Sequence, residues 1–510
     1  MRTVWVLGDQ LNRSIGALAD ATPATHRVLL VRSGAKARSR PWHRQRLHLY
    51  LTAMERFAAE LRDEGFEVDL RDAPDFASGL AAHRAAAAPE EVLVTEPNSR
   101  AARRLTAELD CTTVRSDQFL CHHEDFAAWA TTRPGRLRME DFYRWQRVRL
   151  GVLMDGDEPC GGVWNLDADN REPPPRDGRS WPDAPVFAPD DLDRRVADGL
   201  PSGTVGAAPV GLWPTSRAQA LERLEVFIDQ GLPRFGPHED AMLAAEWKLA
   251  HSVLSSSMNL GLLHPAEVVE AAEVAYRDGR VPLASAEGFV RQVIGWREYV
   301  WGLWWLWESE WDGWNELGAD RPLPPAFTSA GRPDGPDGTD RPDDPATHMA
   351  CVANVLGHVD DHAYAHHIER LMVLGNLCLL TGVRPGELND WMWERFVDGA
   401  EWVMSPNVVG MTLHADGGRM ATKPYAAGGA YIKRMSDHCR GCRYDPGRRT
   451  GEDACPFTTL YWDFLARHEE RFRGNGRMRN QMAGLRRLSD LPEVRARAAE
   501  VLARLDAGTL

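Results

Sequence analysis

The sequence predicts a Rossmann-like α/β domain with a parallel sheet, followed by a large all-α domain. Within residues 1–130, short apolar runs alternate with stretches of helical spacing, and strands that alternate with helices are typical of a parallel sheet covered on both faces. From Ser216 onward, apolar residues recur at helical spacing in one segment after another. We find no internal repeats.

The N-terminal domain is expected to contain both buried strands and amphipathic helices. The strands are Val4–Leu7, Val28–Val31 and Val92–Thr95, and the helices are Arg44–Leu61 and Ala101–Leu109. Ligands of such sheets bind beyond the carboxyl ends of the strands, so the GDQLN turn at Gly8–Asn12 is a candidate binding turn. The domain has no GxGxxG or P-loop motif, which disfavours a nucleotide-dependent dehydrogenase or an NTPase.

Residues 131–215 are expected to form an interdomain linker, because Pro, Gly and Asp accumulate there. Phe142, Tyr143 and Trp145 indicate that parts of this linker are anchored. The helical domain covers 216–510, with amphipathic runs at Ala218–Ile228, Ala241–Leu254, Ala286–Trp307 and Tyr364–Leu380. An insertion at 328–346 is so rich in Pro, Gly and Asp that we expect a mobile acidic loop.

The charge balance of the 510 residues is acidic. Lys and Arg total 60 against 74 Asp and Glu, and the formal charge of −14 excludes a uniformly basic nucleic-acid coat. A local basic groove remains open, because Lys and Arg outnumber acidic residues within 416–449 and 466–489. No apolar stretch reaches about 18 residues, and the N-terminus lacks signal-peptide regions. We expect a cytoplasmic monomer without membrane contact.

Four of the eight cysteines form a candidate metal site. Cys439 and Cys442 are a C-x2-C pair, and Cys455 follows with a proline behind it, so the three thiolates can share one metal face. Cys351 is the best candidate for the fourth ligand, since it stands at an expected helix start after the insertion. By spacing alone, zinc, a [4Fe–4S] cluster and unrelated reduced thiols all remain open.

Histidines and tryptophans give two further signals. An expected helix containing DDHAYAHHIER places His362 and His366 on one face, and the alternatives are structural histidines, a zinc site, or a His366–His367 pair that donates protons. The chain has 19 Trp against 9 Tyr, concentrated between Trp296 and Trp314. Most of these indoles must be packing, because side chains at helical spacing cannot all face one ligand.

Longer motifs run over essentially the whole chain. In the helical part they are RFGPHEDAM at Arg234–Met242, AHSVLSSSMNLGLLHP at Ala250–Pro265, RQVIGWREYVWG at Arg291–Gly302, YAHHIERLMVLGN at Tyr364–Asn376, EWVMSPNVVGM at Glu401–Met411 and TKPYAAGGAYIKRMSDHCRGCRYDP at Thr422–Pro446. GDQLN, TAMERFAAEL and GGVWNLDADNREPP add to them on the N-terminal side. Through these motifs the chain resembles the photolyase/cryptochrome superfamily, specifically its bacterial iron–sulfur branch with the prokaryotic (6-4) photolyases and related cryptochromes.

The resemblance implies cofactors and their ligands. The four ligands of a [4Fe–4S] cluster fall on Cys351, Cys439, Cys442 and Cys455. A U-shaped FAD is implied in the helical domain, where the matching positions are Phe235, Ser252, Leu254, Ser255, Trp296, Arg297, Arg370, Asp398 and Asn407. The serine segment corresponds to a phosphate-binding cradle, and hydroxyls at a helix start suit a diphosphate. The family's N-terminal domain holds a 6,7-dimethyl-8-ribityllumazine antenna, and its binding turn matches Asp9 and Gln10.

The resemblance also implies a reaction on UV-damaged DNA. His366 and His367 match the paired histidines beside the lesion, where a proton donor is needed. Repair in this family begins when excited reduced FAD passes an electron to a flipped-out base lesion. Two function classes follow: light-dependent repair of (6-4) photoproducts, favoured by the histidines and the basic tracts, and a cryptochrome-type photoreceptor that binds a protein partner. Redox chemistry unrelated to DNA is a third, weaker hypothesis.

The chain departs from the family pattern at several positions. LSSSMN stands where the family has an aromatic residue near the flavin. Trp391 matches the family's electron-transfer path, but Met392 follows it, and the insertion replaces the tryptophan expected before Cys351. Lys36 stands where an acidic antenna residue is expected. These departures affect light-driven reduction of FAD by the usual route and the loading of the antenna, and they favour signalling or a divergent role.

Overall fold

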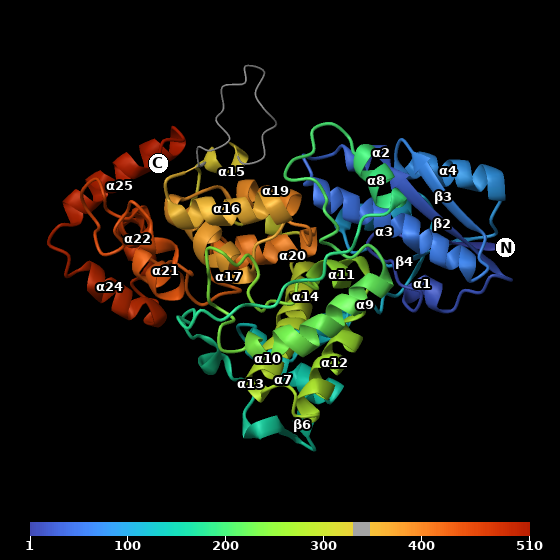
Figure 1. Cartoon of the computed structure of the whole chain (residues 1–510), viewed down its shortest axis with the longest axis horizontal. Coiled ribbons are helices and arrows are strands. Elements are labelled where there is room, and N and C mark those ends of the chain that lie inside the picture. The colour runs from blue at the N-terminus through green and yellow to red at the C-terminus, as the bar shows by residue number, and fades with distance from the viewer. Residues whose placement is uncertain (330–346) are drawn as a thin grey trace.

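The structure is a computed structural model that describes residues 1–329 and 347–510. Its N-terminal part, blue in Figure 1, contains a five-stranded parallel sheet in the order β3-β2-β1-β4-β5. The strands are β1 (Arg2–Trp5), β2 (His26–Ser33), β3 (Val68–Ala73), β4 (Val92–Thr95) and β5 (Thr112–Val114). The α/β fold class and the three expected strands are confirmed, and the two strands that the sequence did not reveal are the partly exposed edges.

Alternating side chains of the sheet pack into two different cores. Val4, Val28 and Leu30 face the core that includes α3, whereas Trp5 and Leu29 face the one that includes α4. This alternation is the period of two that a sheet covered on both faces requires. The surrounding helices are α1 (Gly16–Ala19), α2 (Gly34–Ala37), α3 (Arg44–Asp63), α4 (Phe76–Ala87), α5 (Arg100–Glu108) and α6 (His123–Thr131).

The segment 131–215 contains ordered pieces, as the sequence predicted. Phe142 and Tyr143 are fully buried, and Trp145 packs against the core. The elements here are α7 (Met139–Leu150), the antiparallel pair β6 (Met154–Asp155) and β7 (Glu158–Pro159), and α8 (Asp191–Asp198). The domain boundaries at 130 and 215 stay predictions.

The rest of the chain is helical, and several helices contain π-helical turns. The α-helices are α9 (Arg217–Val226), α10 (Leu232–Phe235), α11 (Ser255–Leu260), α12 (Pro265–Arg277), α13 (Leu283–Val290), α14 (Glu298–Leu306), α15 (Ala326–Ser329), α16 (Ala350–His362), α17 (His367–Glu369), α18 (Asn376–Thr381), α19 (Pro385–Arg395), α20 (Glu401–Ser405), α21 (Gly429–Met435), α22 (Pro456–Arg467), α23 (Glu469–Phe472), α24 (Arg479–Leu485) and α25 (Leu491–Asp506). The π-helical turns are η3 (Phe227–Gly231), η4 (Arg291–Arg297), η6 (Arg370–Gly375) and η7 (Pro406–Thr412). π-Helical turns occur frequently at functional sites.

One expected helix is wrong. The run 241–254 is irregular, because Leu249 and Val253 adopt positive φ angles and Met242 pairs with Ser436 in an isolated bridge. The run 364–380 is helical from His367 to its end, three residues later than expected. Of the other expected runs, 218–228 is helical throughout and 286–307 is helical up to Leu306. The insertion at 328–346 lies outside the described residues except for the end of α15.

The tryptophans of α14 and the following turn lie in the core of the helical part. Trp301, Trp304, Trp305 and Trp311 are buried, which confirms that most of the tryptophan excess is packing. Arg103 lies 3.4 Å over the ring of Trp305, so the N-terminal part packs against this cluster through a cation–π contact. None of the helices in the described ranges combines the length and the apolar character needed to cross a membrane.

A stability prediction follows from the contact between α14 and α6. A Cβ atom on Gly302 would lie 2.1 Å from Cγ of Phe126, a fully buried ring. We expect Gly302→Ala to lower the free energy of unfolding by about 1–3 kcal/mol, because overpacking forces the ring or the helix to move. Gly357→Ala is the matched control, since a Cβ there meets nothing within 4 Å. Denaturant unfolding checks both variants, and equal stabilities would contradict the packing argument.

Candidate functional site

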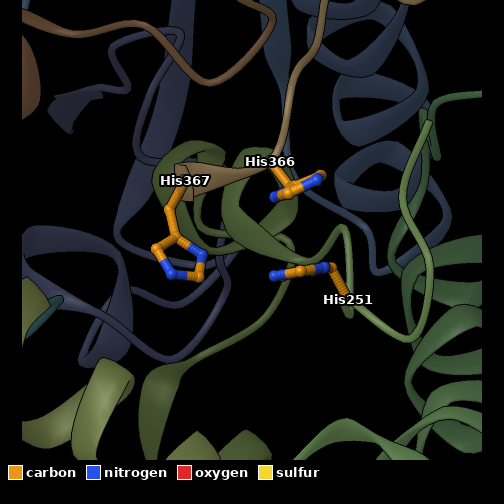
Figure 2. Close-up of side chains that lie close together, drawn as sticks. All are labelled: His251, His366 and His367. Carbon is orange, nitrogen blue, oxygen red and sulfur yellow. The ribbon is translucent and has the colours of Figure 1, made fainter. Parts of the chain in front are cut away.

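Three histidines from two distant segments meet in the helical part (Figure 2). The rings of His251 and His366 lie nearly parallel, with centroids 4.6 Å apart and 16° between their planes, and His367 lies 5.3 Å from His251. His251 and His366 are buried, whereas the side chain of His367 is 46% exposed. The structure therefore brings the predicted pair together with a third histidine that the sequence did not single out.

The local backbone explains how the pair reaches this place. α16 ends at His362, and Ala363 adopts a left-handed conformation (φ 54°) in which its N–H donates to the carbonyl of Val359. His366 is the extended N-cap of α17, so His362 and His366 do not share a helix. His362 lies instead against Trp247, with ring centroids 4.6 Å apart. The alternative of a helical zinc site at His362 and His366 is therefore ruled out.

The cluster is also poorly suited to a single metal ion. The ligand nitrogens of its three members lie within 4.8 Å of one another. A metal bound to imidazole lies close to the ring plane, however, and the planes of His251 and His366 are nearly parallel, one above the other (Figure 2). In-plane lone pairs of such rings do not converge on one point. The arrangement indicates proton chemistry rather than metal binding.

The electrostatic environment separates the three histidines. Asp240 lies 3.4 Å from Nε2 of His367, and this ion pair raises the pKa of His367 in spite of burial and lowers that of Asp240. Burial and the neighbouring His251 hold the pKa of His366 well below the ordinary value. Burial lowers the pKa of His251 to about 3, and its Nδ1–H donates to the carbonyl of Lys248. At neutral pH His367 is the member that most readily holds a proton.

A buried ion pair forms the second part of the site. The guanidinium of Arg370 donates two hydrogen bonds to the carboxylate of Asp398, at 3.0 and 3.2 Å. Ser255 donates a third at 2.6 Å, and the amide of Asn259 donates to the backbone carbonyl of Asp398. Three of the predicted cofactor residues thus converge from α11, η6 and the turn after α19.

The other candidate cofactor residues are more dispersed. Phe235 packs edge-on against His251, Ser252 accepts from the N–H of Leu254 at the entry to α11, and the amide of Asn407 donates to the carbonyl of Val403 in α20. Trp296 and Arg297 lie on η4, where the guanidinium of Arg297 lies over Phe119. In the described ranges, Asn407, Trp296 and Arg297 make no hydrogen bond with Asp398. Beside Ser255, the buried hydroxyls of Ser256 and Ser257 have no hydrogen-bond partner among described residues.

Trp391 borders the ion pair through an aromatic contact. Its indole N–H donates to the carbonyl of Phe327, and its ring meets Phe396, which lies 4.0 Å below the guanidinium of Arg370. In the described part of the chain, the ring contacts of Trp391 are limited to Phe327 and Phe396, and Met392 is buried beside it. The indole therefore has no described tryptophan or tyrosine as an immediate neighbour.

The GDQLN turn lies after β1, at the carboxyl edge of the sheet. Asp9 accepts from the amide of Asn98, and burial raises its pKa. Gln10 donates to the carbonyl of Glu96 at 2.8 Å. The ammonium of Lys36 lies nearby, 5.1 Å above the rings of both Trp42 and Trp393. Polar groups and two indole faces thus lie near one another between the sheet and α19.

The four predicted cysteines line one cavity. Cys351 lies in the first turn of α16, Cys439 and Cys442 lie around the turn after α21, and Cys455 caps α22. Burial and the other three thiols raise the pKa of Cys351, and burial raises that of Cys439 to about 11. A Cβ on Gly429 would lie 2.9 Å from Sγ of Cys455, so only glycine leaves this approach open.

Cationic side chains gather near the exposed edge of the histidine cluster. Burial and the nearby charges of Arg477 and Arg171 lower the pKa of Lys423, and Arg171 also lies close enough to Asp240 to favour its charged form. The half-buried Tyr425 lies near Arg171 and Arg477, and burial raises its pKa. These groups place positive charge beside the only strongly exposed histidine of the three. Sequence reasoning identified Lys423 and Arg477 only as parts of basic tracts, and it missed Asp240 although the residue lies within the RFGPHEDAM motif.

The comparisons with known proteins agree with this architecture. Residues 4–204 match the family model described as deoxyribodipyrimidine photo-lyase-related protein. A (6-4) photolyase of Agrobacterium fabrum is 40% identical over 523 residues, covering 99% of both chains. An uncharacterized protein of Acanthamoeba polyphaga mimivirus is 30% identical over 107 residues, 21% of this chain and 80% of its own. A solved class III photolyase from Agrobacterium tumefaciens shares the fold, with a TM-score of 0.54 at 15% identity over 99% of this chain and 98% of that chain.

The pair of Asp240 and His367 yields a pH prediction. Because its pKa is raised above 6.5, His367 contributes stability that is present below that pH and is lost as the pH rises through the raised value. We expect Asp240→Asn to shift the titration of the His367 ring to lower pH, as followed by NMR of histidine-labelled protein. Asp229→Asn, which removes a surface partner of Arg280, is the control. A His367 titration that both variants leave in place would refute the assignment.

Proposed function

Because the chain belongs to the photolyase family, we propose that it repairs (6-4) pyrimidine–pyrimidone photoproducts in DNA in a light-dependent reaction with FAD. The observation that carries this proposal is the cluster of His251, His366 and His367 beside a carboxylate, in a chain that aligns over its length with a (6-4) photolyase. A proton donor beside the lesion is the group that opening of this adduct requires.

Residues around the buried ion pair fit the cofactor. The Arg370–Asp398 pair and the hydroxyl of Ser255 would face the flavin, and the unpartnered hydroxyls of Ser256 and Ser257 can serve its diphosphate. When bound, reduced FAD supplies the electron that starts repair after absorption of light.

The histidines divide the proton chemistry between them. His367 is paired with Asp240, which raises its pKa, and it is partly exposed, so it is the immediate proton donor to the adduct. His366 is buried and neutral, and it presents an Nδ1 atom without a described partner. Two groups with pKa values pushed in opposite directions are the arrangement that acid–base catalysis uses.

The cationic groups beside the cluster support contact with damaged DNA. Arg171, Lys423 and Arg477 can neutralise phosphates on both sides of a flipped-out nucleotide, and the net charge of −14 does not oppose such a local contact. Phosphate contacts of this kind position the strand without reading its sequence. Repair of a lesion in any sequence context needs this type of binding.

We further propose that the four cysteines hold a [4Fe–4S] cluster. In the described ranges, three potential ligand atoms lie within 4.8 Å of one another in His251–His366–His367 and in Glu96–His122–His123. No three of the four Sγ atoms come this close. The thiols are therefore spread more widely than the edges of a zinc–thiolate tetrahedron, which a Zn–S bond of about 2.3 Å makes about 3.8 Å long. A cavity with four thiolates at larger separation suits a cubane cluster better than a single zinc ion.

A lumazine antenna is proposed for the region beside the GDQLN turn. Asp9 and Gln10 offer polar atoms at the carboxyl edge of the sheet, and Trp42 and Trp393 offer faces on which a flat ring can stack. Lys36 replaces the acidic residue of the family with a cation in this region, which changes the hydrogen bonds available to the chromophore.

A cryptochrome-type photoreceptor is the second candidate function. The observation that favours it is the environment of Trp391, which contacts two phenylalanines instead of a second tryptophan or tyrosine in the described part of the chain. Phenylalanine is not a practical relay for electrons, so the path that would re-reduce the flavin ends early. Repair by flavin that is reduced in another way is unaffected by this difference.

The function is tested with the reduced holoprotein under blue light. We expect it to restore oligonucleotides with a (6-4) photoproduct, and we expect no restoration in the dark. His367→Ala should reduce the repair rate by at least about 100-fold with unchanged FAD content, because general acid catalysis contributes about 10²–10⁴-fold. His468→Ala, at a remote histidine, is the control. Absence of repair by fully reduced wild-type protein would leave the photoreceptor as the function.

The cluster is tested by metal analysis and absorbance. We expect about four iron atoms per chain and a broad visible absorption that disappears in Cys442→Ser. Cys111→Ser, which removes a thiol outside the cavity, should leave both unchanged. Stoichiometric zinc in the anaerobically purified wild-type protein would contradict the proposal.

A further inference from the structure

Buried polar atoms without hydrogen-bond partners accumulate behind His366. Both carboxylate oxygens of Glu369, Nδ1 of His358 and both ring nitrogens of His366 are in this state among the described residues. Glu369 and His366 are completely buried, and the side chain of His358 is 10% exposed. Buried polar groups in native structures are normally paired, so a cluster of unpaired ones calls for a function.

The three groups lie in a row. Oε1 of Glu369 is 3.3 Å from Nδ1 of His358 and 3.6 Å from Nε2 of His366. Neither contact has the alignment of a hydrogen bond, but catalytic hydrogen bonds are often long before the substrate is bound. The carboxyl group therefore stands between a histidine of the active site and a histidine of α16 that reaches the surface.

Resting on the proposed function, we propose that Glu369 and His358 form a proton relay that supplies His366 with a proton, which His366 passes on during repair after His367 has acted as the immediate donor. Glu369 gives its carboxyl proton to Nε2 of His366, and it regains a proton from Nδ1–H of His358. As it gives up this proton, His358 takes one from water at Nε2, so the ring stays neutral but changes tautomer. Only protons move, so the electron that starts repair is not involved, and exchange with water returns His358 to the Nδ1–H tautomer before the next cycle.

The charges around His366 favour a relay over direct protonation from solvent. His251 stacks on one face of the His366 ring, and His358 faces His366 from α16. Two further groups, His367 and Arg370, follow His366 on α17 and η6. All four neighbours oppose a lasting positive charge on His366. Burial raises the pKa of Glu369, so this carboxyl group keeps a proton at a higher pH than an exposed one. Among the described residues, it is the one acid within 4 Å of a ring nitrogen of His366, and it can hold a reserve proton.

The first test is the pH profile of single-turnover repair by reduced holoprotein. We expect wild-type repair to change little between pH 6 and 8, since the relay supplies the proton. In Glu369→Gln the rate should fall about tenfold per pH unit, because His366 then depends on protons from solution. FAD content and binding of damaged DNA should stay at the wild-type level. Glu287→Gln is the matched control, as Glu287 is equally buried but bonded to Tyr143.

The second test needs no repair activity. In the oxidised holoprotein with labelled histidines, the NMR shifts of His358 and His366 should change together in one titration step that belongs to Glu369. That common step should vanish in Glu369→Gln and persist in Glu287→Gln. A shared step that survives in Glu369→Gln, or an unchanged pH profile of repair in that variant, would overturn the relay. Wild-type protein that titrates in this way but repairs nothing would overturn the proposed function instead.

Discussion

The ion pair between Arg370 and Asp398 is the constraint on which the site depends. Both side chains are largely buried, so the pair is stable only because two aligned hydrogen bonds and the hydroxyl of Ser255 satisfy it. Loss of one partner would leave an uncompensated buried charge, at a cost of about 3–5 kcal/mol. The pair also fixes three segments of chain at one point, and His366, His367 and Glu369 directly precede Arg370.

The same arginine holds the chain in a non-helical conformation where the histidines need it. Nε of Arg370 donates to the carbonyl of Ala365, and the N–H of Val397 donates to the carbonyl of Ala363. Buried backbone groups that leave a helix must find such partners. His251 reaches the cluster through a similar interruption, a segment with positive φ at Leu249 and Val253. His251 and His366 therefore come from irregular backbone that neighbouring groups stabilise, whereas His367 begins α17.

This reliance on irregular backbone explains what the sequence could and could not predict. The spacing of apolar residues predicted β1, β2, β4 and the helix α3, because these elements depend on local sequence pattern. The four cysteines were found because cysteine is a rare residue type and two of them form a short motif. The apolar spacing of 241–254 is helical, yet tertiary hydrogen bonds override it, and with it the position of His251 was lost. The family resemblance supplied His366 and His367, but their separation from His362 depends on one left-handed residue, Ala363, whose type gives no warning. The edge strand β3 was not predicted, because its many polar side chains obscure the alternation of apolar and polar residues that marks a strand.

The distribution of acidic groups gives the neighbouring residues His366 and His367 different chemistry. His367 faces Asp240 and the open side, where an ion pair can hold its proton, whereas His366 faces a buried carboxyl group and four groups that oppose a positive charge on it. Adjacent positions in the sequence thus enter opposite environments because α17 begins between them. One histidine can give a proton at once, and the other can only pass on a proton that it has just received. Such a site separates the immediate proton donor, His367, from the histidine that receives protons through the protein, His366.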